Sequence, residues 1–142
     1  MSVTHQVTQE TNDKKPIWSE DGITFDGTDD YLQSRPISIP QPSTIYAVLK
    51  LNNTTGSRLL DSARRSTIGC STALIGDNFR FNFNNQAYSY SLKDYNYIVL
   101  RIVLNGASTN LRLNNYEKII GANTANLDGL TVGSSYIPDI IS

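Results

Sequence analysis

The sequence predicts an all-β protein built as an antiparallel β-sandwich. From residue 17 onward, apolar and polar residues alternate over short runs, which is the pattern of half-buried strands. Turn-forming Gly, Asn, Asp and Pro recur roughly every ten residues, and helical periodicity is hard to find. With 142 residues, 39% of them apolar and 18% charged, the chain fits a single domain with its own core.

Residues 1–15 are predicted to form an N-terminal arm that is either flexible or ordered by a partner. They are mostly polar, and Pro16 ends the stretch. No apolar run follows a basic start, so neither an export signal nor membrane insertion is expected there. Residues 16–142 are then expected to form the domain.

Four segments supply most of the expected strands. Residues 43–51 (STIYAVLKL) alternate regularly, with one face in the core and the other partly covered. Residues 97–104 (YIVLRIVL) are apolar on both faces, which is typical of a central sandwich strand. Residues 111–120 are expected to return antiparallel to them. Residues 127–135 (LDGLTVGSS) are the last expected strand, in which Leu130 and Val132 lie between two glycines.

The clearest strand is expected at residues 78–83 (NFRFNF), which place three phenylalanines on one face: Phe79, Phe81 and Phe83. Residues 86–92 (QAYSYSL) repeat the alternation with tyrosines. The two asparagines between these runs suit a tight turn, so the two segments are predicted to form a hairpin.

The motif GITFDGTDDYLQ, residues 22–33, concentrates acidic residues beside two glycines. We interpret it as a turn in which two aromatic residues anchor successive strands and the acids accept backbone N–H bonds. On this interpretation Asp29→Ala lowers stability. The predicted turn residues are Phe25, Asp26, Gly27, Asp29, Asp30 and Tyr31.

A calcium site is the alternative interpretation of the same motif, because carboxylate oxygens on loops are typical calcium ligands. The candidate ligands are Asp26, Asp29 and Asp30. Their spacing does not match an EF-hand loop, which needs alternating ligands and a distant glutamate. The turn is favoured over the metal, and no other cofactor is expected.

The segments GITFDGTDDYL, STIYAVLKL, SRLLDS, NLRLNNYEK and GLTVGSS follow one another across residues 17–135. In this order they resemble the laminin-G-like branch of the concanavalin A-like lectin/glucanase superfamily. The resemblance implies a concanavalin A-like jelly roll, which usually serves adhesion, carbohydrate binding or particle structure.

The C-terminal end departs from that pattern, because members of the family usually add one more strand after the GLTVGSS-like segment. Here the chain continues as YIPDIIS, and Pro138 interrupts strand pairing. The last strand is therefore expected to be missing or supplied by a partner. In the second case, a neighbouring subunit covers an exposed sheet edge.

No enzymatic activity is expected from the sequence. The E-x-D-x-E pattern of the glucanases is absent, and glutamate occurs only at Glu10, Glu20 and Glu117. The single histidine, His5, lies in the predicted arm, so a nucleophile activated by histidine is not expected either.

Glycan binding is expected to use exposed aromatic rings beside polar side chains, although each ring also suits an ordinary strand position. The candidates are Trp18, Tyr88, Tyr90, Tyr95 and Tyr116, from a pool that also includes Tyr97 and Tyr136.

The leading functional hypothesis is a non-enzymatic virion structural protein of a bacteriophage: a capsid decoration, head fibre or tail module that binds host surface glycans. A lectin-like fold without export signal or disulfide suits a protein made in the host cytoplasm and displayed on the virion surface. The arm would contact other virion proteins or copies of the chain. The alternative is an extracellular, carbohydrate-binding adhesion module of a larger cell-surface protein. A net charge of −1 gives no reason to expect nucleic-acid binding.

Overall fold

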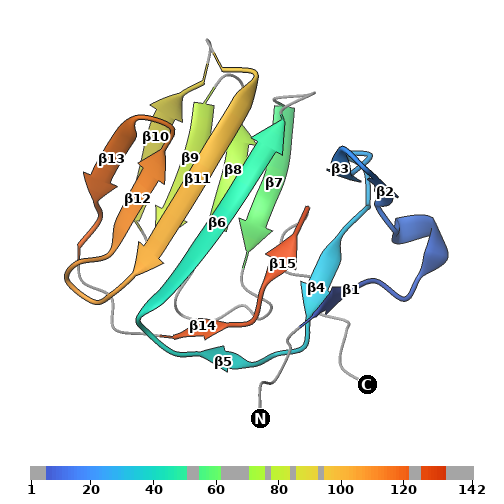
Figure 1. Ribbon diagram of the computed structural model, residues 1–142, viewed down its shortest axis with the longest axis horizontal. Coiled ribbons are helices and arrows are strands. Elements are labelled where there is room, and N and C mark those ends of the chain that lie inside the picture. Colours follow the sequence, from blue (N-terminus) through green and yellow to red (C-terminus); the bar gives the residue numbers. More distant parts are fainter. Residues whose placement is uncertain are drawn as a thin grey trace.

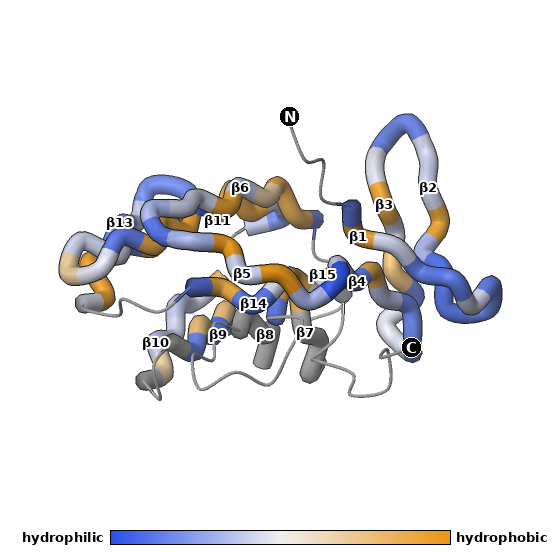
Figure 2. The backbone as a smooth tube through the Cα atoms, turned by 90° about the horizontal axis from the view of Figure 1, so that it is seen from below, coloured by the Kyte–Doolittle hydropathy of each residue, from blue (hydrophilic) through white to orange (hydrophobic). Residues whose placement is uncertain are grey.

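The computed structural model describes residues 6–50, 55–61, 71–75, 78–83, 86–92, 95–121 and 126–133. Within these ranges the regular structure is almost entirely strand, and the only helix is a 3₁₀ turn, η1 (Asn12–Lys14). All strand pairs are antiparallel, and two sheets face each other across the core (Figures 1 and 2). The predicted all-β antiparallel sandwich is confirmed.

The larger sheet has seven strands, with short strands at one end and longer strands at the other (Figure 1). In spatial order the strands are β1 (Val7–Thr8), β4 (Leu32–Ser34), β15 (Thr131–Val132), β7 (Thr55–Asp61), β8 (Ser71–Ile75), β9 (Asn78–Phe83) and β10 (Gln86–Ser91). Strands β9 and β10 pair along their whole length, which confirms the predicted hairpin.

The smaller sheet has four strands, in the order β13 (Tyr116–Ile119), β12 (Asn110–Leu113), β11 (Tyr97–Leu104) and β6 (Ser43–Lys50). The sequence predicts one returning strand over residues 111–120, but the structure has two. They are separated by a turn at Asn114, whose φ of 49° is left-handed. Asparagine tolerates this conformation, so the chain reverses there instead of continuing.

Two further pairs lie outside the main sheets. Strands β5 (Ser38–Ile39) and β14 (Leu127–Asp128) pair at one rim of the sandwich. Strands β2 (Ile17–Ser19) and β3 (Gly22–Thr24) form a hairpin that stands clear of both sheets (Figure 2).

The core lies between the inner faces of the two sheets. Phe79 and Phe81 contribute from β9, and alternate residues of β11 and β12 meet them from the smaller sheet. The buried apolar residues of this cluster are Leu60, Phe79, Phe81, Leu92, Ile98, Leu100, Ile102, Leu104, Leu111, Leu113, Ile120 and Leu127. Phe83 has no described side chain, so its predicted place in the core is not tested.

The outer face of the smaller sheet corrects two predictions. The second face of β6 is expected to be partly covered, and β11 is expected to be buried on both faces. Instead Tyr46 and Val48 of β6 and Tyr97 and Val99 of β11 are each more than half exposed. No described element packs over this face, and burial alternates residue by residue along both strands.

Part of the predicted arm belongs to the larger sheet, because Val7 and Thr8 pair with Ser34 and Gln33 of β4. The expectation of a missing or borrowed last strand concerns residues 134–142, which lie outside the described residues, as does Tyr136. In the part of the chain that the structure describes, no helix is long and apolar enough to span a bilayer.

Candidate functional site

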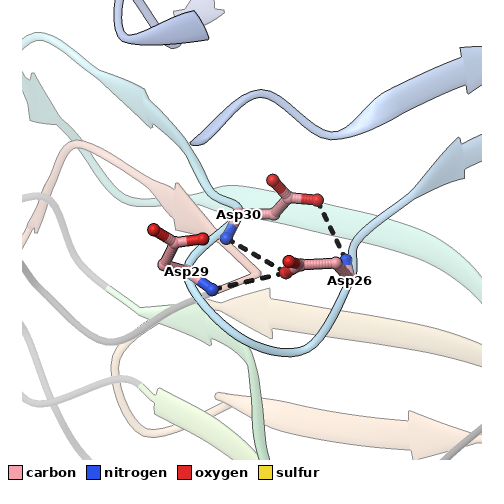
Figure 3. A group of neighbouring side chains, drawn as sticks. All are labelled: Asp26, Asp29 and Asp30. Carbon is pink, nitrogen blue, oxygen red and sulfur yellow. Dashed lines mark hydrogen bonds between the residues drawn. The ribbon is translucent and has the colours of Figure 1, made fainter. Parts of the chain in front are cut away.

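The acidic motif folds into a tight turn between β3 and β4, held mainly by one carboxylate. Asp26 Oδ1 accepts the backbone N–H of Thr28 at 2.8 Å, of Asp29 at 3.3 Å and of Asp30 at 3.4 Å. In return, Asp30 Oδ2 accepts the N–H of Asp26 at 2.9 Å (Figure 3). The N–H of Thr28 is the main cause that lowers the pKa of Asp26 below 3.8.

The structure differs from the sequence-based expectation at Asp29. Its backbone N–H donates to Asp26, but no described N–H donates to its own carboxylate, which is exposed (Figure 3). Two of the three acids therefore hold the turn through their side chains. The third only occupies a position in it.

The two aromatic residues of the motif contact the sandwich. Tyr31 is buried, with 5% of its surface exposed, immediately before β4. Phe25 packs its ring against the backbone of Gly133, which follows β15. Gly27 adopts a φ of 79°, which residues with a Cβ resist. The motif thus fixes the entry of the chain into the larger sheet.

The same three acids bring carboxylate oxygens within 4.8 Å of one another. Calcium takes six to eight oxygen ligands. Here, three N–H dipoles already point at Asp26 Oδ1, and the backbone of Asp26 engages one oxygen of Asp30. This geometry uses the carboxylates for the turn, and calcium binding stays a prediction from sequence.

Asp26→Ala is expected to lower the thermal unfolding temperature at neutral pH, because three backbone N–H groups lose their acceptor. Asp29→Ala is the matched control and is expected to leave the unfolding temperature nearly unchanged. Since the folded-state pKa of Asp26 is lowered, its contribution is present above pH 3.8 and is lost as the pH falls through the folded pKa. Thermal melts of both variants over this acid range check the effect. Equal losses for the two variants would contradict the assignment.

A second feature is a cleft of about 540 Å³ at the open side of the sandwich, between edge strands β10 and β13. Figures 1 and 2 show these two strands at the same end of the molecule, in different layers. We call this feature the tyrosine cleft. The residues that line it are Ala87, Tyr88, Ser89, Tyr90, Ser91, Leu92, Tyr95, Leu113, Asn114, Tyr116 and Lys118.

Contacts between the two layers shape this cleft. The rings of Tyr90 and Tyr116 lie 4.6 Å apart, centroid to centroid, at an interplanar angle of 57°. The Tyr88 hydroxyl donates to the carbonyl of Ile120 at 3.1 Å. The Lys118 ammonium lies 4.9 Å from the centre of the Tyr88 ring, within the range of a cation–π contact.

The four tyrosines of the cleft differ in exposure: two form its floor and two lie at its mouth. Tyr88 and Tyr90 are half-buried, and burial, together with the neighbouring Tyr116, raises the pKa of Tyr90 to about 12. Its phenol is therefore protonated throughout the physiological range. Tyr95 and Tyr116 are about half exposed at the mouth.

The structure gathers four of the five predicted glycan-binding candidates at this cleft: Tyr88, Tyr90, Tyr95 and Tyr116. Trp18 lies elsewhere, on the β2–β3 hairpin, and Tyr97 lies on the outer face of the smaller sheet. Sequence reasoning did not include Lys118. Its spacing of two from Tyr116 in a strand is the signal that places both side chains on one face.

None of the described residues that line the cleft is acidic, and none is histidine or cysteine. The chemistry available from these side chains is stacking, hydrogen bonding from hydroxyl and amide groups, and attraction to the Lys118 ammonium.

Compared with known protein families, curated proteins and solved structures, the chain gives no match.

Proposed function

We propose that this protein is a non-enzymatic, lectin-like module that binds glycans in the tyrosine cleft. The observation that supports the proposal is the convergence of four tyrosines, three from the two sheets and Tyr95 from the segment before β11, on one cleft with a polar rim. Sugar rings have apolar C–H faces that stack on aromatic rings, and their hydroxyls need hydrogen-bonding partners beside those rings.

The cleft offers both kinds of contact. The half-exposed rings of Tyr95 and Tyr116 present surface for stacking at the mouth. Lys118 adds an ammonium group to the same space, and Asn114 lines it with an amide that also accepts the N–H of Val99 at 2.8 Å and donates to the carbonyl of Tyr97 at 3.4 Å. The bond from the Tyr88 hydroxyl to Ile120 ties the two layers together, so the floor is held in place before a ligand arrives.

The wider setting of this module is also a proposal. The order of segments that resembles the laminin-G-like branch supports a concanavalin A-like jelly roll, and we propose a place on a virion, as a bacteriophage capsid decoration, head fibre or tail module. Mass spectrometry of purified virions tests that place. Absence of the chain from the particles would favour the adhesion module of a larger cell-surface protein.

Tyr116→Ala is expected to weaken glycan binding about tenfold, equivalent to ~1.4 kcal/mol, because a stacking ring at the mouth is lost. A glycan array on the purified protein identifies a ligand. Calorimetry with that oligosaccharide in solution then measures affinity without avidity. Tyr116→Phe keeps the ring and is expected to keep most of the affinity.

Tyr46→Ala is the matched control, because it removes an even more accessible tyrosine from the outer face of the smaller sheet, remote from the cleft. It is expected to leave the solution affinity unchanged. A protein that binds no glycan on a broad array, or whose affinity falls equally in the Tyr46 and Tyr116 variants, would contradict the proposed site.

A further inference from the structure

The β2–β3 hairpin exposes an unusual amount of apolar surface for so small an element. Ile17, Trp18 and Ile23 are each at least half exposed, and Trp18 reaches 75%. Trp18 and Ile23 are directly opposite each other in the strand register. Among the described strands, β2 and β3 pair only with each other, and an isolated two-stranded hairpin is marginally stable in water. Docking on another surface would stabilise it.

The outer face of the smaller sheet is a second apolar surface. Tyr46 and Val48 are 72% exposed, and Tyr97 and Val99 lie beside them on β11. Val48 is opposite Val99 in the register, so these side chains form one continuous patch over two strands. Contiguous exposed patches of this kind usually mark interaction sites.

The charges of the two surfaces are opposite. The two-residue turn at the tip of the hairpin is Glu20-Asp21, and residues 17–24 contain no basic residue. On the outer face, Lys50 lies at one end of the apolar patch, opposite Tyr97. At the other end, Arg101 and Arg112 face each other in the register. The only acid beside these arginines in the register is Glu117, which forms an ion pair with Arg101.

We propose that the hairpin of one copy docks on the outer face of the smaller sheet of a second copy. In Figure 2 the hairpin rises on the side to which this sheet turns its outer face. A two-fold axis through that side would let each hairpin reach the other copy's sheet, which is the closed, self-complementary geometry of most dimers. Trp18 and Ile23, which share one face of the hairpin, would cover the apolar patch. The acidic tip would then meet basic side chains at one end of it. This proposal is independent of glycan binding.

Charge reversal in both surfaces tests the docking. By sedimentation velocity the wild-type protein is expected to be a dimer. A hairpin variant, Glu20→Lys with Asp21→Lys, is expected to be monomeric because its tip then faces cations. A face variant, Lys50→Glu with Arg112→Glu, is expected to be monomeric for the converse reason, whichever end of the patch the tip meets. An equimolar mixture of the two variants is expected to dimerise again, since both hairpin–face contacts become attractive.

Glu10→Lys with Asp13→Lys is the matched control, because it reverses two exposed acids outside the hairpin and is expected to leave the dimer intact. Circular dichroism and thermal melts of each variant confirm that it is folded. A monomeric wild-type protein would overturn the proposal, and so would a hairpin variant that still dimerises. A mixture that stays monomeric would exclude this pairing of surfaces, and the wild-type dimer would then form through a different contact.

Discussion

Gly133→Ala is expected to destabilise the fold by about 3 kcal/mol or more, because the added Cβ both strains the backbone and clashes with its neighbours. Gly133 has a φ of 85°, which residues with a Cβ adopt only under strain. A Cβ built there would lie 2.3 Å from Cδ1 of the Phe25 ring and 3.1 Å from the carbonyl oxygen of Asp30. Chemical denaturation at neutral pH measures the loss.

Gly27→Ala separates the backbone effect from the steric one. Gly27 has a similar φ of 79°, but a Cβ there would meet no atom within 4 Å. Its substitution is expected to cost only about 1 kcal/mol. In a Phe25→Ala background, the cost of Gly133→Ala is expected to fall toward that value, because the clash is gone. Equal costs for the two glycines in the wild-type background would show that the Phe25 contact contributes nothing.

Phe79→Ala is expected to destabilise the protein by about 3–5 kcal/mol, because it removes a fully buried ring and leaves a cavity between the sheets. The same change is also expected to weaken the proposed glycan binding. Phe79 is opposite Tyr90 in the β9–β10 register, so the cavity opens beside the floor of the tyrosine cleft. Denaturation gives the stability, and calorimetry on the folded fraction gives the affinity.

Arg80→Ala is the neighbouring control for Phe79→Ala. Arg80 lies on the same strand, but its side chain is on the exposed face, so its loss is expected to change stability by only about 0.5 kcal/mol. A Phe79 variant as stable as the Arg80 variant would mean that the sheets do not pack through β9.

The strands with regular alternation follow from local sequence. In β9 every second residue is a phenylalanine long enough to reach the opposite sheet, and the residues between them are polar, so the period of two alone specifies the strand and its inward face. The turn at residues 26–30 is also local, since a short acidic side chain bonds N–H groups two to four residues ahead. Its sequence distinguishes Asp26 from Asp29 poorly, because either acid has the right chemistry.

The outer face of the smaller sheet shows where sequence reasoning fails. Tyr97 and Val99 are apolar enough for a covered face, and only the presence or absence of another layer decides their exposure. The tyrosine cleft could not be predicted from local sequence either. Tyr88 and Tyr116 are 28 positions apart in the numbering and belong to different sheets, so no local pattern joins them.

Local sequence is therefore sufficient to predict strands β6, β9, β10 and β11, the inward face of β9 and the position of the acidic turn, because these depend on neighbouring residues and on a side-chain period of two. The packing of the sheets determines which strand edges meet, which apolar face stays exposed and which backbone the Phe25 ring contacts. These features depend on the packing of two sheets, which brings together residues as distant as Phe25 and Gly133.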